Sequence, residues 1–84
     1  MKDEILKEIA RIAREKGFKL TSHARDQMTA RKLSTYLVQD ILLNPRRLIR
    51  VDEKTHTIYK IQGGRYNRKL AVRIDKQIIV VTVM

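Results

Sequence analysis

The chain has 84 residues, no cysteine, and 19 Lys and Arg against 9 Asp and Glu, which gives a formal charge of +10. This length predicts one domain over residues 1–84. The lack of cysteine excludes disulfides and thiolate zinc sites and favours a reducing cytoplasm. No stretch approaches the roughly 20 apolar residues of a membrane helix. The positive charge favours a polyanionic partner, either nucleic acid or an acidic protein, over a merely solvated surface.

The first segment is predicted to be a helix over residues 3–16. Apolar side chains recur there at three- and four-residue spacing, which is typical of an amphipathic helix, and Gly17 is a suitable stop. Residues 18–21 alternate and are too few for a helix, so we expect a short strand or an extended entry.

Two short helices are expected next. Ser22 is predicted to cap a helix at about 23–31, because its hydroxyl can accept a hydrogen bond from the first turn. Ser34 caps a helix at 35–43, which ends at Asn44-Pro45 because the residue before a proline avoids helical backbone angles. The residues expected to be buried in this second helix are Leu37, Val38, Ile41 and Leu42.

From residue 47 onward the apolar pattern has a period of two, which predicts strands. The predicted strands are Arg47–Asp52, Thr57–Gln62, Arg68–Ile74 and Gln77–Val83. Their connections are short, so neighbouring strands should pair antiparallel in a meander. The expected fold class is therefore α+β, with N-terminal helices packed on one face of a four-stranded antiparallel sheet.

The alternation also predicts which face of the sheet each side chain occupies. Leu70, Val72 and Ile74 should face the core, and the residues between them should face the solvent. The last strand is apolar on both faces from Ile78 to Val81, so it should lie inside the sheet or be covered on both sides. The basic residues expected on the open face are Arg50, Lys60 and Arg73.

The stretch with the clearest functional pattern lies at residues 20–34. His23, Gln27 and Arg31 are four residues apart and therefore share one face of a helix. Ala24 and Met28 form an apolar stripe beside them. An imidazole beside a guanidinium on a short helix with an apolar back suggests a site.

The run His23-Ala24-x-x-Gln27-Met28-x-x-Arg31-x-Leu33-Ser34 resembles a family of small prokaryotic domains of unknown function. That family has the signature His-Ala-x-x-Arg-Met-x-x-Arg-x-Ile-Ser followed by a four-stranded sheet, and this chain departs from it at Gln27. It looks like a relative of the BrnT and RelE/ParE toxins, which share a compact α+β fold with barnase-type nucleases. The resemblance covers residues 18–84, so the helix within 1–17 looks like an added element.

The resemblance implies a metal-independent ribonuclease of a toxin–antitoxin system, acting on RNA at or near the ribosome and neutralised by an acidic antitoxin protein. No metal or cofactor is expected. Such cleavage needs a base, an acid and a cation that stabilises the phosphorane. An imidazole titrates near neutrality, so His23 can serve as base or acid, with Arg31 on phosphate and Tyr59 or Tyr66 as proton donor or stacking ring. The cations expected to bind nucleic acid are Arg50, Lys60, Arg68 and Arg73.

Each of these residues also has a purely structural interpretation. A histidine at a helix start is often a hydrogen-bonded structural residue, and Arg31 could tie its helix to a carboxylate such as Asp40. Tyr59 could be a half-buried packing residue, His56 an exposed turn residue, and Gly63-Gly64 a hairpin turn rather than a phosphate loop. The alternative function is accordingly a non-catalytic domain that binds nucleic acid or an acidic protein.

Overall fold

The computed structural model describes residues 2–84, with side chains from Glu4 onward, and contains three helices and five strands. The helices and strands all lie within two residues of their predicted positions. The helices are α1 (Lys2–Lys16), α2 (Ser22–Arg31) and α3 (Thr35–Leu43). The strands are β1 (Phe18–Leu20), β2 (Pro45–Glu53), β3 (Thr57–Gly63), β4 (Arg68–Asp75) and β5 (Gln77–Val83).

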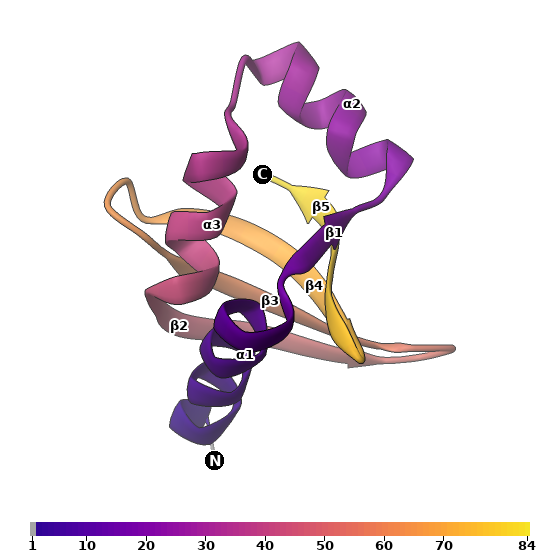
Figure 1. Ribbon diagram of the computed structural model, residues 1–84. Coiled ribbons are helices and arrows are strands. Elements are labelled where there is room, and N and C mark those ends of the chain that lie inside the picture. The colour runs from indigo at the N-terminus through magenta and orange to yellow at the C-terminus, as the bar shows by residue number, and fades with distance from the viewer. Residues whose placement is uncertain (1) are drawn as a thin grey trace.

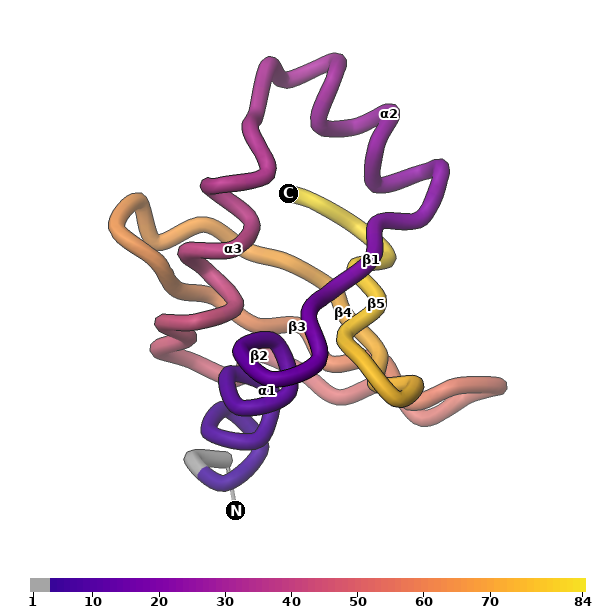
Figure 2. The backbone as a smooth tube through the Cα atoms, in the orientation of Figure 1, coloured from indigo at the N-terminus to yellow at the C-terminus, as the bar shows by residue number. Residues whose placement is uncertain are grey.

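The strands form one open sheet in the order β1-β5-β4-β3-β2. Strands β2 to β5 are the predicted antiparallel meander, and β5 lies inside the sheet as its two apolar faces indicate. The predicted count of four strands was wrong, because β1 adds a fifth strand that pairs parallel with β5, with Leu20 opposite Val80 (Figure 2). Three alternating residues do not reveal a partner that lies some sixty residues further along the chain.

The three helices cover one face of this sheet (Figure 1). Helix α1 contacts β2 and β5, α3 contacts β3 and β4, and α2 lies against β5 and β1. Helix α1 supplies Leu6, Ile9 and Ile12 to the hydrophobic core, so it is an integral part of the domain that the structure describes. The other core residues are Ala24, Met28, Val38, Ile41, Leu42, Ile61, Leu70, Val72, Ile78, Val80 and Val83.

Two residues expected in the core are more exposed than predicted. Ile74 is 36% exposed, because it shares a face with the buried Leu70 and Val72 but lies near the end of β4, close to the turn into β5. Leu37 is only half-buried and lines a surface groove at the start of α3. A period-2 or helical pattern gives the direction of a side chain, whereas burial also depends on what packs above it.

The cap of α2 is Thr21 and not the predicted Ser22. The Thr21 hydroxyl accepts a hydrogen bond from the backbone N–H of Ala24 at 3.1 Å, and the Thr21 N–H itself donates to Val80 of β5. Thr and Ser are both favourable N-cap residues, so the sequence alone does not choose between Thr21 and Ser22. The choice depends on the pairing of β1 with β5, which holds Thr21 at the start of the helix. Ser34 caps α3 as predicted, since its hydroxyl accepts from the Leu37 N–H.

The Gly63-Gly64 pair begins the predicted hairpin turn between β3 and β4. Gly64 has φ +74°, and its N–H donates to the Asn44 carbonyl at 3.0 Å. A Cβ atom on Gly63 would lie 2.7 Å from the Pro45 Cα, so only glycine permits this approach between β3 and the start of β2.

Candidate nucleic-acid interface

The face of the sheet opposite the helices is a basic surface. Ile61 and Leu70 are fully buried beneath the helices, so the alternate residues of their strands, such as Lys60 and Ala71, face the other way. None of the residues on this open face belongs to the buried core. The sheet therefore presents one uncovered side to solvent.

The register brings cations from four of the five strands, all except β5, onto this face. Arg50 pairs with Lys60 across β2 and β3, and Lys60 pairs in turn with Ala71 of β4. Further toward β1, Arg73 of the central strand β4 and Lys19 of β1 both pair with Ile79 of β5. The full set of cations is Lys19, Arg47, Arg50, Lys60, Lys69 and Arg73.

Two carboxylates partly balance these charges. The Arg50 guanidinium lies 2.7 Å from an Asp52 carboxylate oxygen, and that of Arg73 lies 3.6 Å from Asp75. Both pairs are substantially exposed, so each contributes little and can be replaced by a ligand phosphate. The face therefore keeps a net positive charge that is available to a polyanion.

The sequence-based prediction grouped four cations, and the structure brings three of them together. Arg50, Lys60 and Arg73 all lie on the open face. Arg68 lies instead on the helix side of β4, where it lines a groove beside Leu37 and donates to the carbonyl of Met84 at 3.4 Å.

The residues of the helical signature mostly contact backbone. Gln27 accepts a hydrogen bond from the Val83 N–H at 2.8 Å, and Arg31 donates to the Val83 carbonyl at 2.7 Å. The Thr21 hydroxyl also donates to the Val81 carbonyl at 3.2 Å. Strand β1 ends opposite Val80, so these side chains satisfy the edge of β5 where it would otherwise be unpaired. The predicted tie from Arg31 thus goes to a backbone carbonyl, not to Asp40.

His23 lies in the first turn of α2 and is exposed. Among the residues that the structure describes, it makes no hydrogen bond or ion pair. Gln27 and Arg31, which follow it at four-residue spacing, are engaged with Val83. The shared helix face therefore serves mainly to attach α2 to β5 through Gln27 and Arg31, and the His23 side chain at its start is exposed to solvent.

Tyr59 lies in another part of the molecule. It pairs with Val51 and Val72 in the sheet, and it lines a cavity of about 240 Å³ at the β2–β3 turn together with His56, Thr57, Arg73 and Ile74. The predicted catalytic set of His23, Arg31 and Tyr59 is therefore divided between α2 and this cavity. Sequence reasoning treated His56 as a turn residue, because no local spacing relates it to an arginine on β4.

In the part of the chain that the structure describes, no three His, Cys, Asp or Glu side chains are grouped so that they could hold a metal ion. No described helix has the length and apolar character needed to span a bilayer.

Comparison with protein families gives a match over most of the chain. A family model described as a domain of unknown function, DUF4258, matches residues 20–84. The matched region begins at the end of β1, so α1 lies outside it although α1 contributes to the core. No curated protein and no solved structure matches the chain.

Proposed function

The chain belongs to this family of unknown function, DUF4258, and we propose that it binds RNA through the open face of its sheet, as a RelE/BrnT-like toxin module of a toxin–antitoxin system. The observation that carries the proposal is the gathering of cations from four strands, β1 to β4, on one uncovered face. Phosphate contacts supply most of the affinity of such surfaces, so a basic face of this kind favours a polyanion.

The open face also offers apolar contacts between its cations. Ile58 and Ile79 lie among the basic side chains and remain partly accessible. Apolar side chains between cations suit a single strand whose unstacked bases can contact them, because duplex RNA hides its bases in a deep groove. Single-stranded RNA is accordingly the expected ligand.

Binding to a short single-stranded RNA at several salt concentrations tests this proposal. The logarithm of the binding constant should fall linearly with the logarithm of salt concentration, with a slope of roughly −0.7 per phosphate contact. Lys60→Gln should reduce that slope by about one contact, whereas Arg68→Gln, which removes a cation on the opposite side of the sheet, should leave it unchanged. Equal effects of the two variants would mean that the sheet face is not the binding surface.

Cleavage of the bound RNA is a second candidate function, and the cavity at the β2–β3 turn favours it. His56, Tyr59 and Arg73 line this cavity, which supplies an imidazole for proton transfer, a phenol and a guanidinium for phosphate. Arg73 also belongs to the open face, so RNA bound there would lie next to the cavity. The alternative assignment uses His23 of α2 as the base or acid.

The two histidines are matched controls for each other, because both are exposed and neither lies in the core. If the cavity cleaves RNA, His56→Ala should lower the cleavage rate by roughly 10²–10⁴-fold while His23→Ala has little effect. The reverse pattern would assign the chemistry to α2. Cleavage that survives in both variants would exclude a mechanism that needs either imidazole, whereas no cleavage by the wild-type protein would leave RNA binding as the function.

A further inference from the structure

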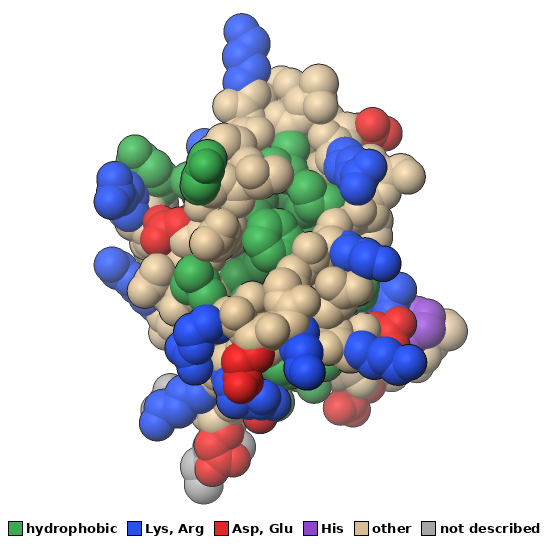
Figure 3. Space-filling view, viewed as in Figure 1, with side chains coloured by type: hydrophobic (Ala, Val, Ile, Leu, Met, Phe, Trp, Pro, Cys, Tyr) green, Lys and Arg blue, Asp and Glu red, His purple; other side chains and the backbone are tan. Residues whose placement is uncertain are grey.

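A second surface lies on the helix side of the sheet and differs in character from the basic face. Three adjoining hollows of about 540, 360 and 330 Å³ form a groove, which we call the helix-side groove. The first two hollows are mainly apolar, and the third also has polar lining residues such as Ser34 and Asp40. The first and second share Leu33, and the second and third share Leu37 and Tyr66. Figure 3 shows apolar side chains gathered in a hollow near the middle of this face, with Lys and Arg side chains and some Asp and Glu side chains further out.

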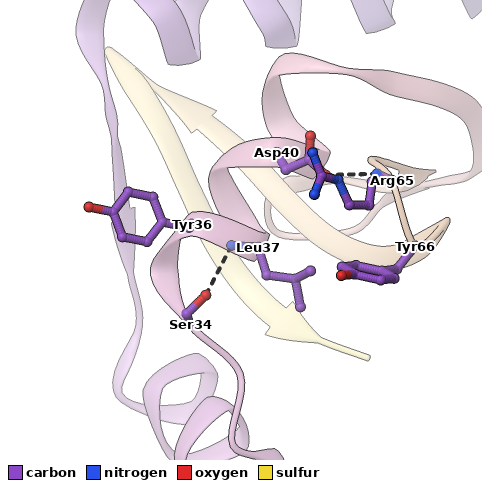
Figure 4. Close-up of a pocket in the computed structure, with 6 residues that line it drawn as sticks. All are labelled: Ser34, Tyr36, Leu37, Asp40, Arg65 and Tyr66. Carbon is purple, nitrogen blue, oxygen red and sulfur yellow. Dashed lines mark hydrogen bonds between the residues drawn. The ribbon is translucent and has the colours of Figure 1, made fainter.

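The walls of the helix-side groove are held in place by the fold. Asp40 of α3 accepts a hydrogen bond from the Arg65 N–H at 2.7 Å, which fixes the β3–β4 turn against α3. This contact places the Tyr66 ring beside Leu37, as Figure 4 shows. At the other end, the Leu33 N–H donates to the Met28 carbonyl at 2.9 Å and positions Leu33 after α2.

The apolar side chains on the floor of the groove are accessible to solvent, although these hydrogen bonds hold its walls in place. Tyr66 is 66% exposed, and Leu33 and Leu37 are only half-buried. A preformed, exposed apolar surface with fixed walls is typical of a protein interaction site, because binding then requires little ordering.

The rim of the groove is basic. Its cations are Arg25, Lys32, Arg65 and Arg68. The carboxylate among the lining residues, Asp40, already accepts hydrogen bonds from the Arg65 N–H and from the Asn44 side chain. A ligand with apolar and negatively charged groups would therefore find complementary partners along the whole length of the groove.

We propose that the helix-side groove binds an acidic amphipathic helix of a partner protein, with apolar side chains on the groove floor and carboxylates against the rim. The groove offers two apolar contact regions, one at Leu33 and one at Leu37 with Tyr66, and an amphipathic helix binds such a groove through its apolar face. A second copy of this chain fits less well, because its formal charge of +10 would oppose the basic rim. The proposal does not depend on RNA binding, which uses the opposite face.

A synthetic amphipathic peptide of leucine and glutamate tests this proposal, with the same peptide carrying lysine in place of glutamate as its control. Backbone amide shifts recorded by NMR should change at Leu33, Leu37 and Tyr66 on addition of the acidic peptide. The lysine peptide should produce no such change. Equal binding of both peptides, or amide shifts confined to the open sheet face, would contradict the proposal.

Variants then separate the two faces. Tyr66→Ala removes an exposed ring and should weaken binding of the acidic peptide about tenfold or more. Arg25→Glu with Lys32→Glu should also weaken it, whereas the matched pair Lys19→Glu with Lys69→Glu should leave peptide affinity unchanged and weaken RNA binding. Peptide binding that survives the first three substitutions, or self-association of the free protein through Leu33 and Leu37, would overturn the assignment.

Discussion

Replacing Arg31 with alanine tests whether the signature arginine holds the fold together. Its guanidinium donates to the Val83 carbonyl at 2.7 Å, a short distance for a charge-assisted hydrogen bond. Such bonds contribute about 1.5–3 kcal/mol, and the low end applies because Arg31 is largely exposed and water can reach the released carbonyl. A loss of about 1.5 kcal/mol should lower the melting temperature of a domain of this size by about 6–12 °C.

Thermal unfolding followed by circular dichroism measures this loss directly. His23→Ala is the matched control, since His23 lies on the same helix, is exposed, and makes no hydrogen bond to the described residues. The melting temperature of this variant should stay within about 2–4 °C of the wild type, as is usual for surface substitutions. If Arg31→Ala melts like the wild-type protein but loses RNA binding or cleavage, the structural interpretation of Arg31 is refuted and its guanidinium serves the ligand.

Three further stability predictions follow from single contacts. Gln27→Glu should fold normally because it keeps the oxygen that accepts from the backbone of β5, whereas Gln27→Arg should cost about 1–3 kcal/mol in the free energy of unfolding, since that N–H then loses its acceptor. Thr21→Ala should lower the free energy of unfolding by about 1 kcal/mol and Ser22→Ala by much less, as measured by denaturant titration. The opposite order of the two losses would mean that Ser22 is the cap. Gly63→Ala should cost about 1–3 kcal/mol in the same titration, and an unchanged midpoint would mean that β2 can move away from the added methyl group.

The periodic parts of the fold could be predicted from the sequence, and the long-range pairing could not. The change of period near residue 47 identified the meander, and the apolar run from Ile78 to Val81 correctly placed β5 inside the sheet. The same run required a neighbour on each side of β5, but nothing local marks Phe18–Leu20 as that neighbour. Two strands that pair in parallel but are separated by most of the chain have no characteristic spacing in the sequence that would reveal their pairing.

The candidate site was predictable only where strand alternation decides it. Alternation placed Arg50, Lys60 and Arg73 on one face, which the register confirms. It could not relate His56 in a turn to Arg73 on another strand, because that proximity arises from the hairpin geometry. Helical spacing likewise showed that Gln27 shares a face with its neighbours, but not that this face meets the backbone of β5.

The most direct test of the central proposal is to map the RNA-contacting surface on the whole domain. Amide shifts in the NMR spectrum should change on addition of a short single-stranded RNA, and we expect the largest changes along the central row of the open face, at Lys60, Ala71 and Thr82. Residues of the helix-side groove, such as Leu37, should not respond. Shifts centred on Leu37 with an unaffected sheet row would contradict RNA binding by the open face.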